Sequence, residues 1–137
     1  MDYDLRKMIM HQIAQDELMF FNKHPTAYPL YELFVERLLE MFPSTSIRVH
    51  KSQITFSNRH IYACASFLHV KKKTELPDPY IVITLGLSYP LESARVAAKT
   101  EPYSRRWTTH IVINSQSELD DELFAWIRQA YDFAASK

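Results

Sequence analysis

The sequence predicts an α+β domain, with a mainly antiparallel sheet of four to five strands and two N-terminal helices and one C-terminal helix packed on it. Three observations support this fold class. The apolar period changes from 3.6 to 2 near Ser46, and it returns to 3.6 after Ser117. The first strands are joined by connections of hairpin length, which favour antiparallel pairing. With 47% hydrophobic residues, 1–137 is expected to form a single domain.

Two helices are expected before the sheet. An apolar stripe at helical spacing predicts a helix over 1–22, and its members are Leu5, Met8, Ile9 and Ile13. Thr26 is the predicted N-cap of a second helix over 26–42, which ends before Pro43.

A third helix is expected at the C-terminal end, over 117–135. Ser117 is its predicted N-cap, with Asp120 three residues further on and acidic residues in the first turn. The residues that define its buried stripe are Leu119, Leu123, Ile127, Ala130 and Ala134. This helix is expected to pack on the sheet.

The sheet is expected between residues 46 and 114. Runs of alternating or continuous apolar residues predict strands over 46–50, 53–56, 60–70, 80–87 and 107–113. The segment 88–106 has weak periodicity and two prolines, so it is interpreted as a long functional loop.

Charge is distributed unevenly along a chain whose formal net charge is zero and whose pI is near 7.0. From Met41 to Thr74 there is no Asp or Glu. The cations of this segment are Arg48, Lys51, Arg59, Lys71, Lys72 and Lys73. A basic surface attracts an anionic partner even when the protein as a whole is neutral.

A second basic tract, EPYSRRWTTH over 101–110, alternates arginines with aromatic rings. Guanidinium groups bind phosphates or carboxylates while rings stack, so this tract suits anion or base recognition. A structural alternative stays open, in which Trp107 packs in the core and Tyr103 covers an edge. The candidate binding residues are Arg48, Lys51, Arg59, Arg95, Tyr103, Arg105, Arg106, Trp107 and His110.

Several chemistries are excluded by the residues that the chain lacks. With Gly86 as its only glycine, it has neither a phosphate-binding loop nor a dinucleotide-binding turn, and there is no GxSxG motif. The six histidines do not share metal-ligand spacing with Cys or carboxylates, so no metal and no cofactor is expected. Cys64 is interpreted as a structural thiol, and no catalytic residue is assigned.

Three function hypotheses remain. The first is a non-catalytic binding module with a basic and aromatic face for an anionic partner, either nucleic acid or an acidic protein. The second is a small-molecule-binding protein or enzyme with a pocket near Arg106 and His110. The third is a homodimer that associates through Tyr89, Tyr103 and Trp126. A single cysteine, no secretory signal and no long apolar run indicate a cytoplasmic protein without membrane contact.

Most of the chain resembles a known family. The segments LPDPYIVITLGLSYPLESARVAAKTEPYSRRWTTHIVI and ELDDELFAWIRQAYDF, together with KSQITFSNRHIYACASF and HPTAYPLYELFVERL, are similar to small bacterial proteins grouped as domain of unknown function 5655. The resemblance extends from about His24 to Phe133. It implies an α+β architecture and brings no activity, substrate or catalytic residue.

Overall fold

A computed structural model describes residues 2–137, and it places the side chains of Leu5 and of residues 7–137. The α-helices are α1 (Asp2–Phe20), α2 (Tyr28–Met41) and α3 (Asp121–Ala135). The strands are β1 (Ser46–Val49), β2 (Gln53–Ser57), β3 (Ile61–Ser66), β4 (Ile81–Leu87), β5 (Val96–Tyr103) and β6 (Arg106–Ile113). Short 3₁₀ helices are η1 (Pro25–Ala27), η2 (Lys73–Glu75) and η3 (Gln116–Glu118).

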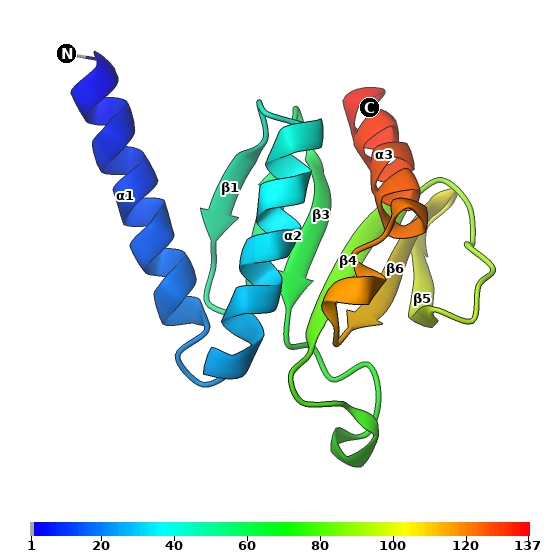
Figure 1. The fold of residues 1–137 in the computed structure, drawn as a ribbon. Helices are drawn as coiled ribbons and strands as arrows, with labels where there is room; N and C mark the ends of the chain where they lie inside the picture. Colours follow the sequence, from blue (N-terminus) through cyan, green and yellow to red (C-terminus); the bar gives the residue numbers. More distant parts are fainter. Residues whose placement is uncertain (1) are drawn as a thin grey trace.

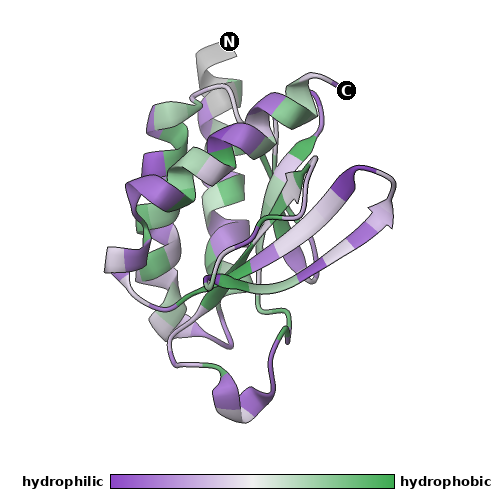
Figure 2. Cartoon of the chain, turned by 90° about the vertical axis from the view of Figure 1, so that its right-hand side faces the viewer, coloured by the Kyte–Doolittle hydropathy of each residue, from purple (hydrophilic) through white to green (hydrophobic). Residues whose placement is uncertain are grey.

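The strands form one antiparallel sheet in the order β1-β2-β3-β4-β6-β5. Figure 1 shows α2 and α3 lying over one face of this sheet, while α1 lies beside the edge strand β1. In the side view of Figure 2 the β5–β6 hairpin leans away from the helix layer. The predicted α+β class is therefore confirmed, and one face of the sheet has no α-helix of residues 2–137 lying over it.

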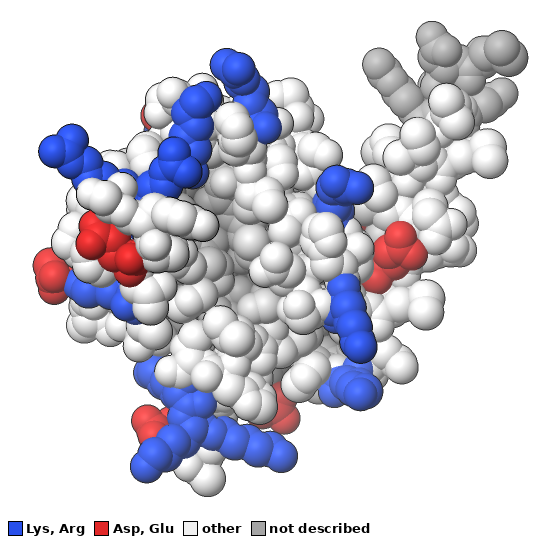
Figure 3. Space-filling view, turned by 180° about the vertical axis from the view of Figure 1, so that it is seen from behind, with Lys and Arg blue, Asp and Glu red and all other residues white. Residues whose placement is uncertain are grey.

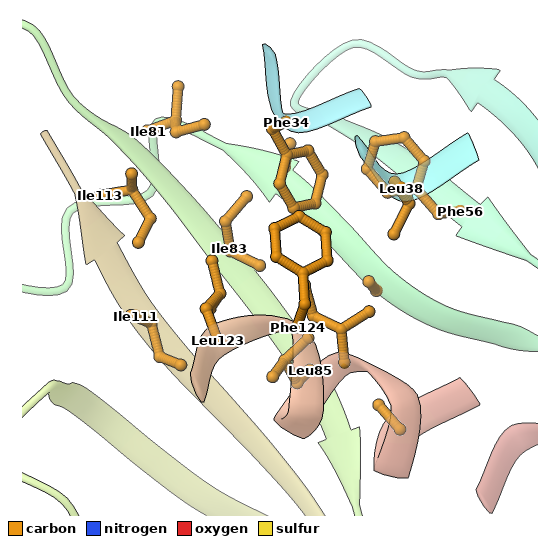
Figure 4. Close-up of a cluster of buried hydrophobic side chains, with 14 of the residues drawn as sticks. Phe34, Leu38, Phe56, Ile81, Ile83, Leu85, Ile111, Ile113, Leu123 and Phe124 are labelled. Atoms are coloured by element: carbon orange, nitrogen blue, oxygen red, sulfur yellow. The ribbon is translucent and has the colours of Figure 1, made fainter. Parts of the chain in front are cut away.

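The hydrophobic core lies between α2, α3 and the covered face of the sheet (Figure 4). Phe34 of α2 is fully buried, with its ring centroid 5.6 Å from that of Phe56 and 5.9 Å from that of Phe124. The strands contribute alternate apolar residues to this core, among them Ile54, Ile81, Ile83, Leu85, Ile111 and Ile113.

A β-bulge in β3 sets which side chains reach each face. Phe56 pairs with Ala63 and Ser57 pairs with Ile61, so Tyr62 is an extra residue in the ladder. Tyr62 and Ala63 both belong to the core, and Tyr62 packs against the ring of Phe42. The alternation restarts after the bulge, so the next residue of β3, Cys64, faces away from the helices.

The sheet has six strands rather than four to five, because the expected loop over 88–106 contains β5. β5 includes Lys99, Glu101 and Pro102, which are poor strand formers. It is an edge strand that pairs only with β6, where a proline and charged residues are tolerated. This segment is a strand because it pairs with β6, so the strand could not be predicted from the propensities of its own residues.

Two predicted helix caps are wrong. Thr26 lies within η1 and its hydroxyl donates to the Asp78 carboxylate at 3.2 Å, while α2 begins at Tyr28 without a side-chain cap. At the last helix Ser115, not Ser117, forms a capping box, and it does so on η3. Asp120 is the N-cap of α3 and accepts from the backbone N–H of Leu123 at 3.0 Å.

The predicted first helix is present as α1, but its apolar stripe is not packed against the sheet. Leu5, Met8 and Ile9 are 58%, 68% and 52% exposed. The C-terminal half of α1 is held through Glu17, whose carboxylate accepts a hydrogen bond from the Tyr31 hydroxyl of α2.

β3 ends at Ser66, four residues before the predicted boundary of that strand at residue 70.

The buried hydroxyl of Thr109 leads to a testable prediction about the free energy of unfolding. Thr109 is 0% exposed and its Oγ1 has no hydrogen-bond partner in the described part of the chain. Burying an unpaired hydroxyl is unfavourable, so Thr109→Val should raise the free energy of unfolding by about 1 kcal/mol. Urea denaturation measures this change.

A matched control is Thr84→Val. The Thr84 hydroxyl is bonded to His110 at 2.8 Å, so this second variant should lower the free energy of unfolding. Equal destabilisation by both substitutions would contradict the assignment of an unpaired hydroxyl at Thr109.

Candidate functional site

A row of mostly polar side chains crosses the uncovered face of the sheet. Each member of the row is the direct cross-strand partner of the next, and direct partners share a face. The row comprises Arg48, Thr55, Cys64, Thr84 and His110. Its neighbours along the strands, such as Ile83 and Ile111, point into the core. The period of two thus separates an apolar covered face from a more polar uncovered one.

A cavity of about 1060 Å³ hollows this uncovered face. In the view from behind, Figure 3 shows the hollow near the centre, with Lys and Arg side chains set around it. Cys64, Thr84 and His110 line the cavity, as do Gly86 and Thr108. Its floor is therefore built mainly from small side chains of the central strands β3, β4 and β6.

Among the residues whose side chains the structure describes, the lining contains no Asp or Glu. Its basic and imidazole side chains are Lys23, Lys51, His24, His69 and His110. Lys23 and Lys51 have no acidic partner among the described residues. With unpaired cations and no carboxylate, the electrostatics of the cavity favour a negatively charged occupant.

One wall of the cavity is aromatic. The ring of His24 stacks on that of Phe67 at 3.9 Å between centroids, and Phe20 stacks on Phe67 at 5.7 Å. Phe20 is the last residue of α1, His24 lies in the connection after it, and Phe67 follows β3. The Tyr80 hydroxyl donates to the backbone carbonyl of Phe67 at 3.2 Å, which holds that segment in place.

The two titratable groups of the floor are neutral at pH 7. Burial raises the pKa of the Cys64 thiol to about 11, so the thiol is protonated and is not an activated nucleophile. Burial also lowers the pKa of His110 below its usual range, and its Nδ1 lies 2.8 Å from the Thr84 hydroxyl. The floor is therefore polar without being charged.

Most of the other predicted cations lie in connections at the two ends of the strands. The antiparallel order brings the β2–β3 turn with Arg59 to the end where Arg105 and Arg106 close the β5–β6 hairpin. The pKa of Lys137 is lowered mainly by burial and, to a smaller extent, by the nearby positive charge of Arg106. Lys51 and the run Lys71, Lys72 and Lys73 lie towards the other end.

Three of the predicted binding residues lie elsewhere. Arg95 is bound to the carboxylates of Asp120 and Glu122, so its charge is already neutralised. Trp107 pairs with Leu87 and therefore faces the helix-covered side of the sheet. Tyr103 is 70% exposed at the hairpin, away from the cavity lining.

Of the predicted residues, Lys51 and His110 line the cavity and Arg48 lies on the same face. Lys23, His24 and His69 were missed, because the connections that carry them have no periodic signal. Alternation along the strands does place Cys64, Thr84 and His110 opposite to core positions, so part of the floor was visible in the sequence.

The described residues hold no group of three or more His, Cys, Asp or Glu that could bind a metal ion. No described helix is long and apolar enough to cross a membrane. The side chains that were considered for a homodimer differ in exposure. The Tyr89 hydroxyl donates a hydrogen bond to the Gln129 side chain of α3. Trp126 is half-buried, and the Arg95 guanidinium lies over its ring, with Cζ 5.5 Å from the ring centroid.

Fold and site together define a class of α+β domain in which helices cover one face of an antiparallel sheet and the other face carries an acid-free cavity. The chain belongs to the family described as domain of unknown function (DUF5655), whose profile matches residues 18–134. Comparison with curated proteins gave no match, and comparison with solved structures gave none either.

Proposed function

We propose that this protein is a non-catalytic binding module that takes an anionic ligand on the uncovered face of its sheet. The observation that carries the proposal is the composition of the cavity lining, which includes Lys23 and Lys51 and no carboxylate. A volume of about 1060 Å³ suits a small organic molecule. Of the two residues named in the small-molecule hypothesis, His110 lies on the cavity floor and Arg106 is not a lining residue.

The absence of activated groups supports binding rather than catalysis. The thiol of Cys64 is protonated at neutral pH, and no carboxylate lines the cavity to orient His110 as a base. Cys64 is a free thiol, which is compatible with a reducing compartment, and we place the module in the cytoplasm.

The charge of the cavity is tested with 8-anilinonaphthalene-1-sulfonate, an anionic aromatic probe whose fluorescence reports binding. The double variant Lys23→Glu/Lys51→Glu should bind this probe about tenfold more weakly, because two attractive charges become repulsive. Added salt should also weaken binding to the wild-type protein. Cys64, the only cysteine, should be alkylated by iodoacetamide more slowly when the probe occupies the cavity.

The matched control is Lys71→Glu/Lys72→Glu, which makes the same charge change on a loop outside the cavity lining. This control should bind the probe nearly as the wild type does. Equal loss in both double variants, or no protection of Cys64, would show that the probe binds elsewhere and would reject the proposal.

A single strand of nucleic acid is a second candidate ligand. The observation that favours it is the presence of basic residues at both ends of the strands, because a nucleic-acid strand that runs along the β-strands would approach both groups. In a filter-binding titration at low salt, a labelled oligothymidylate should then be retained, and salt should release it. No retention, or retention indifferent to salt, removes this candidate and leaves the small anion.

A further inference from the structure

The two ends of the sheet carry different kinds of cation. Arginines lie at the end with the β2–β3 and β5–β6 turns, and they are Arg59, Arg105 and Arg106. The other end carries lysines in three connections, which are 21–27 after α1, 50–52 between β1 and β2, and 67–80 between β3 and β4. We call this region the lysine end, and its lysines, all exposed, are Lys23, Lys51, Lys71, Lys72 and Lys73. The first and third of these connections lie at the bottom of Figure 1.

Two exposed aliphatic side chains lie beside these lysines. Met19, in the last turn of α1, is 74% exposed, and Leu68, in the connection after β3, is 50% exposed. The rings of their neighbours in sequence, Phe20 and Phe67, stack with centroids 5.7 Å apart, so the end of α1 lies beside the start of that connection. The β1–β2 turn with Lys51 also lies here, because β2 begins opposite the end of β3. The lysine end is therefore one continuous surface built from three connections.

Carboxylates are few at the lysine end. The three connections contain five lysines and two acidic residues, Glu75 and Asp78, which gives them a net charge of +3. Asp78 accepts a hydrogen bond from the Thr26 hydroxyl. Among the described residues, none of the five lysines forms an ion pair with a carboxylate. This surface therefore attracts anions.

Lysines beside exposed aliphatic side chains favour one kind of anionic partner. Protein–protein interfaces are depleted in lysine, and sites for single-stranded nucleic acid use exposed rings on which bases stack. At the lysine end Phe20 and Phe67 stack on each other, and the most exposed apolar side chains are aliphatic. An anionic bilayer fits this composition, because aliphatic side chains enter the boundary between headgroups and acyl chains, and its negative surface potential attracts lysines.

We propose that the lysine end docks on the surface of a membrane that contains anionic lipids. Leu68 and Met19 enter the headgroup region, and the lysines contact the headgroups. This inference goes beyond the proposed function, which concerns a ligand inside the cavity. Docking on a surface needs no segment that crosses the bilayer. It departs from the expectation of a protein without membrane contact, which rested in part on the lack of a long apolar run.

Co-sedimentation with lipid vesicles tests the charge of this site. The protein should sediment with vesicles made of phosphatidylcholine and phosphatidylglycerol in equal amounts, and added salt should release it. It should not sediment with phosphatidylcholine alone. Lys71→Glu/Lys72→Glu/Lys73→Glu should bind the anionic vesicles at least about tenfold more weakly.

The matched control is Arg59→Glu/Arg105→Glu/Arg106→Glu, which makes the same charge change at the other end of the sheet. This control should keep most of the vesicle binding. Equal losses in both triple variants, or no binding of the wild type to anionic vesicles, overturns the proposal. If the lysine variant still binds vesicles but no longer retains oligothymidylate, the lysine end serves nucleic acid and the proposal is rejected.

The outcome is separable from that of the proposed function. Neither triple variant changes a residue of the cavity lining, so both should bind 8-anilinonaphthalene-1-sulfonate nearly as the wild type does. Failure of vesicle binding with normal probe binding rejects the membrane site alone. Failure of probe binding with normal vesicle binding rejects the cavity ligand alone.

A fluorescence measurement tests which end enters the membrane. Leu68→Trp places an indole at the lysine end, and its emission should shift to shorter wavelength when anionic vesicles are added. The matched control is Ile61→Trp at the other end of β3, because Ile61 is also 50% exposed. The control should show no shift beyond that of the wild type, which contains Trp107 and Trp126. No shift at residue 68, or equal shifts at both positions, overturns the assigned docking surface.

Discussion

Replacing Phe34 with alanine is expected to lower the free energy of unfolding by about 3–5 kcal/mol. The Phe34 ring is 0% exposed and lies between α2, the sheet and α3, where it contacts Phe56 and Phe124. Removing it leaves a cavity that neighbouring rings fill only in part, so both burial and packing are lost.

This loss is large relative to the stability of a domain of this size, which is about 5–15 kcal/mol in total. Urea denaturation followed by far-UV circular dichroism measures it. The control is Leu33→Ala on the same helix, at a side chain that is 37% exposed, and about 1 kcal/mol or less is expected there. Similar losses at both positions would contradict the assignment of Phe34 to the centre of the core.

Replacing Arg95 with methionine is the second large change, and it should cost about 2 kcal/mol. The Arg95 guanidinium donates to both carboxylate oxygens of Asp120, at 2.9 and 3.1 Å. It also donates to the Glu122 carboxylate at 3.1 Å and to the backbone carbonyl of Glu118 at 2.8 Å. These bonds join the start of β5 to the beginning of α3, and Arg95 is only 22% exposed.

The same variant should change the response of the protein to acid. Burial opposes ionisation of Asp120, but hydrogen bonds from Arg95 and from the Leu123 N–H outweigh it and lower the pKa of Asp120. A carboxyl with a depressed pKa stabilises the fold above its unfolded pKa of about 4, and this stability is lost as the pH falls through the folded value. Arg95→Met should therefore lose less stability on acidification than the wild type does.

Urea denaturation at pH 7 and at pH 3 measures both effects. The control is Glu92→Gln, which breaks an ion pair with Lys99 at a side chain that is 85% exposed. Exposed pairs contribute about 0–1 kcal/mol, so this variant should differ little from the wild type at either pH. If Arg95→Met differs as little from the wild type as this control does, Arg95 has no structural role, and its guanidinium would be available to bind a ligand.

The outcome at Arg95 illustrates what could not be predicted for the site. Its basic character was evident, but its partners lie 23 to 27 residues further along the chain. Lys51 and His110, which the acid-free segment and the aromatic tract suggested as binding residues, both line the cavity. Lys23 and His24 line the cavity because the end of α1 and the connection after it pack beside the segment after β3.

The sequence by itself determined the α+β class, the period of the main elements that it predicted and the alternation along their strands, except at the bulge of β3. These properties depend on residues within a few positions of one another, so a local pattern carries them. The strand β5, the exposure of α1 and the bare face of the sheet were decided by the tertiary structure. Each depends on contacts between residues distant in sequence, since an edge strand forms only against its partner and a face stays open only where no helix packs.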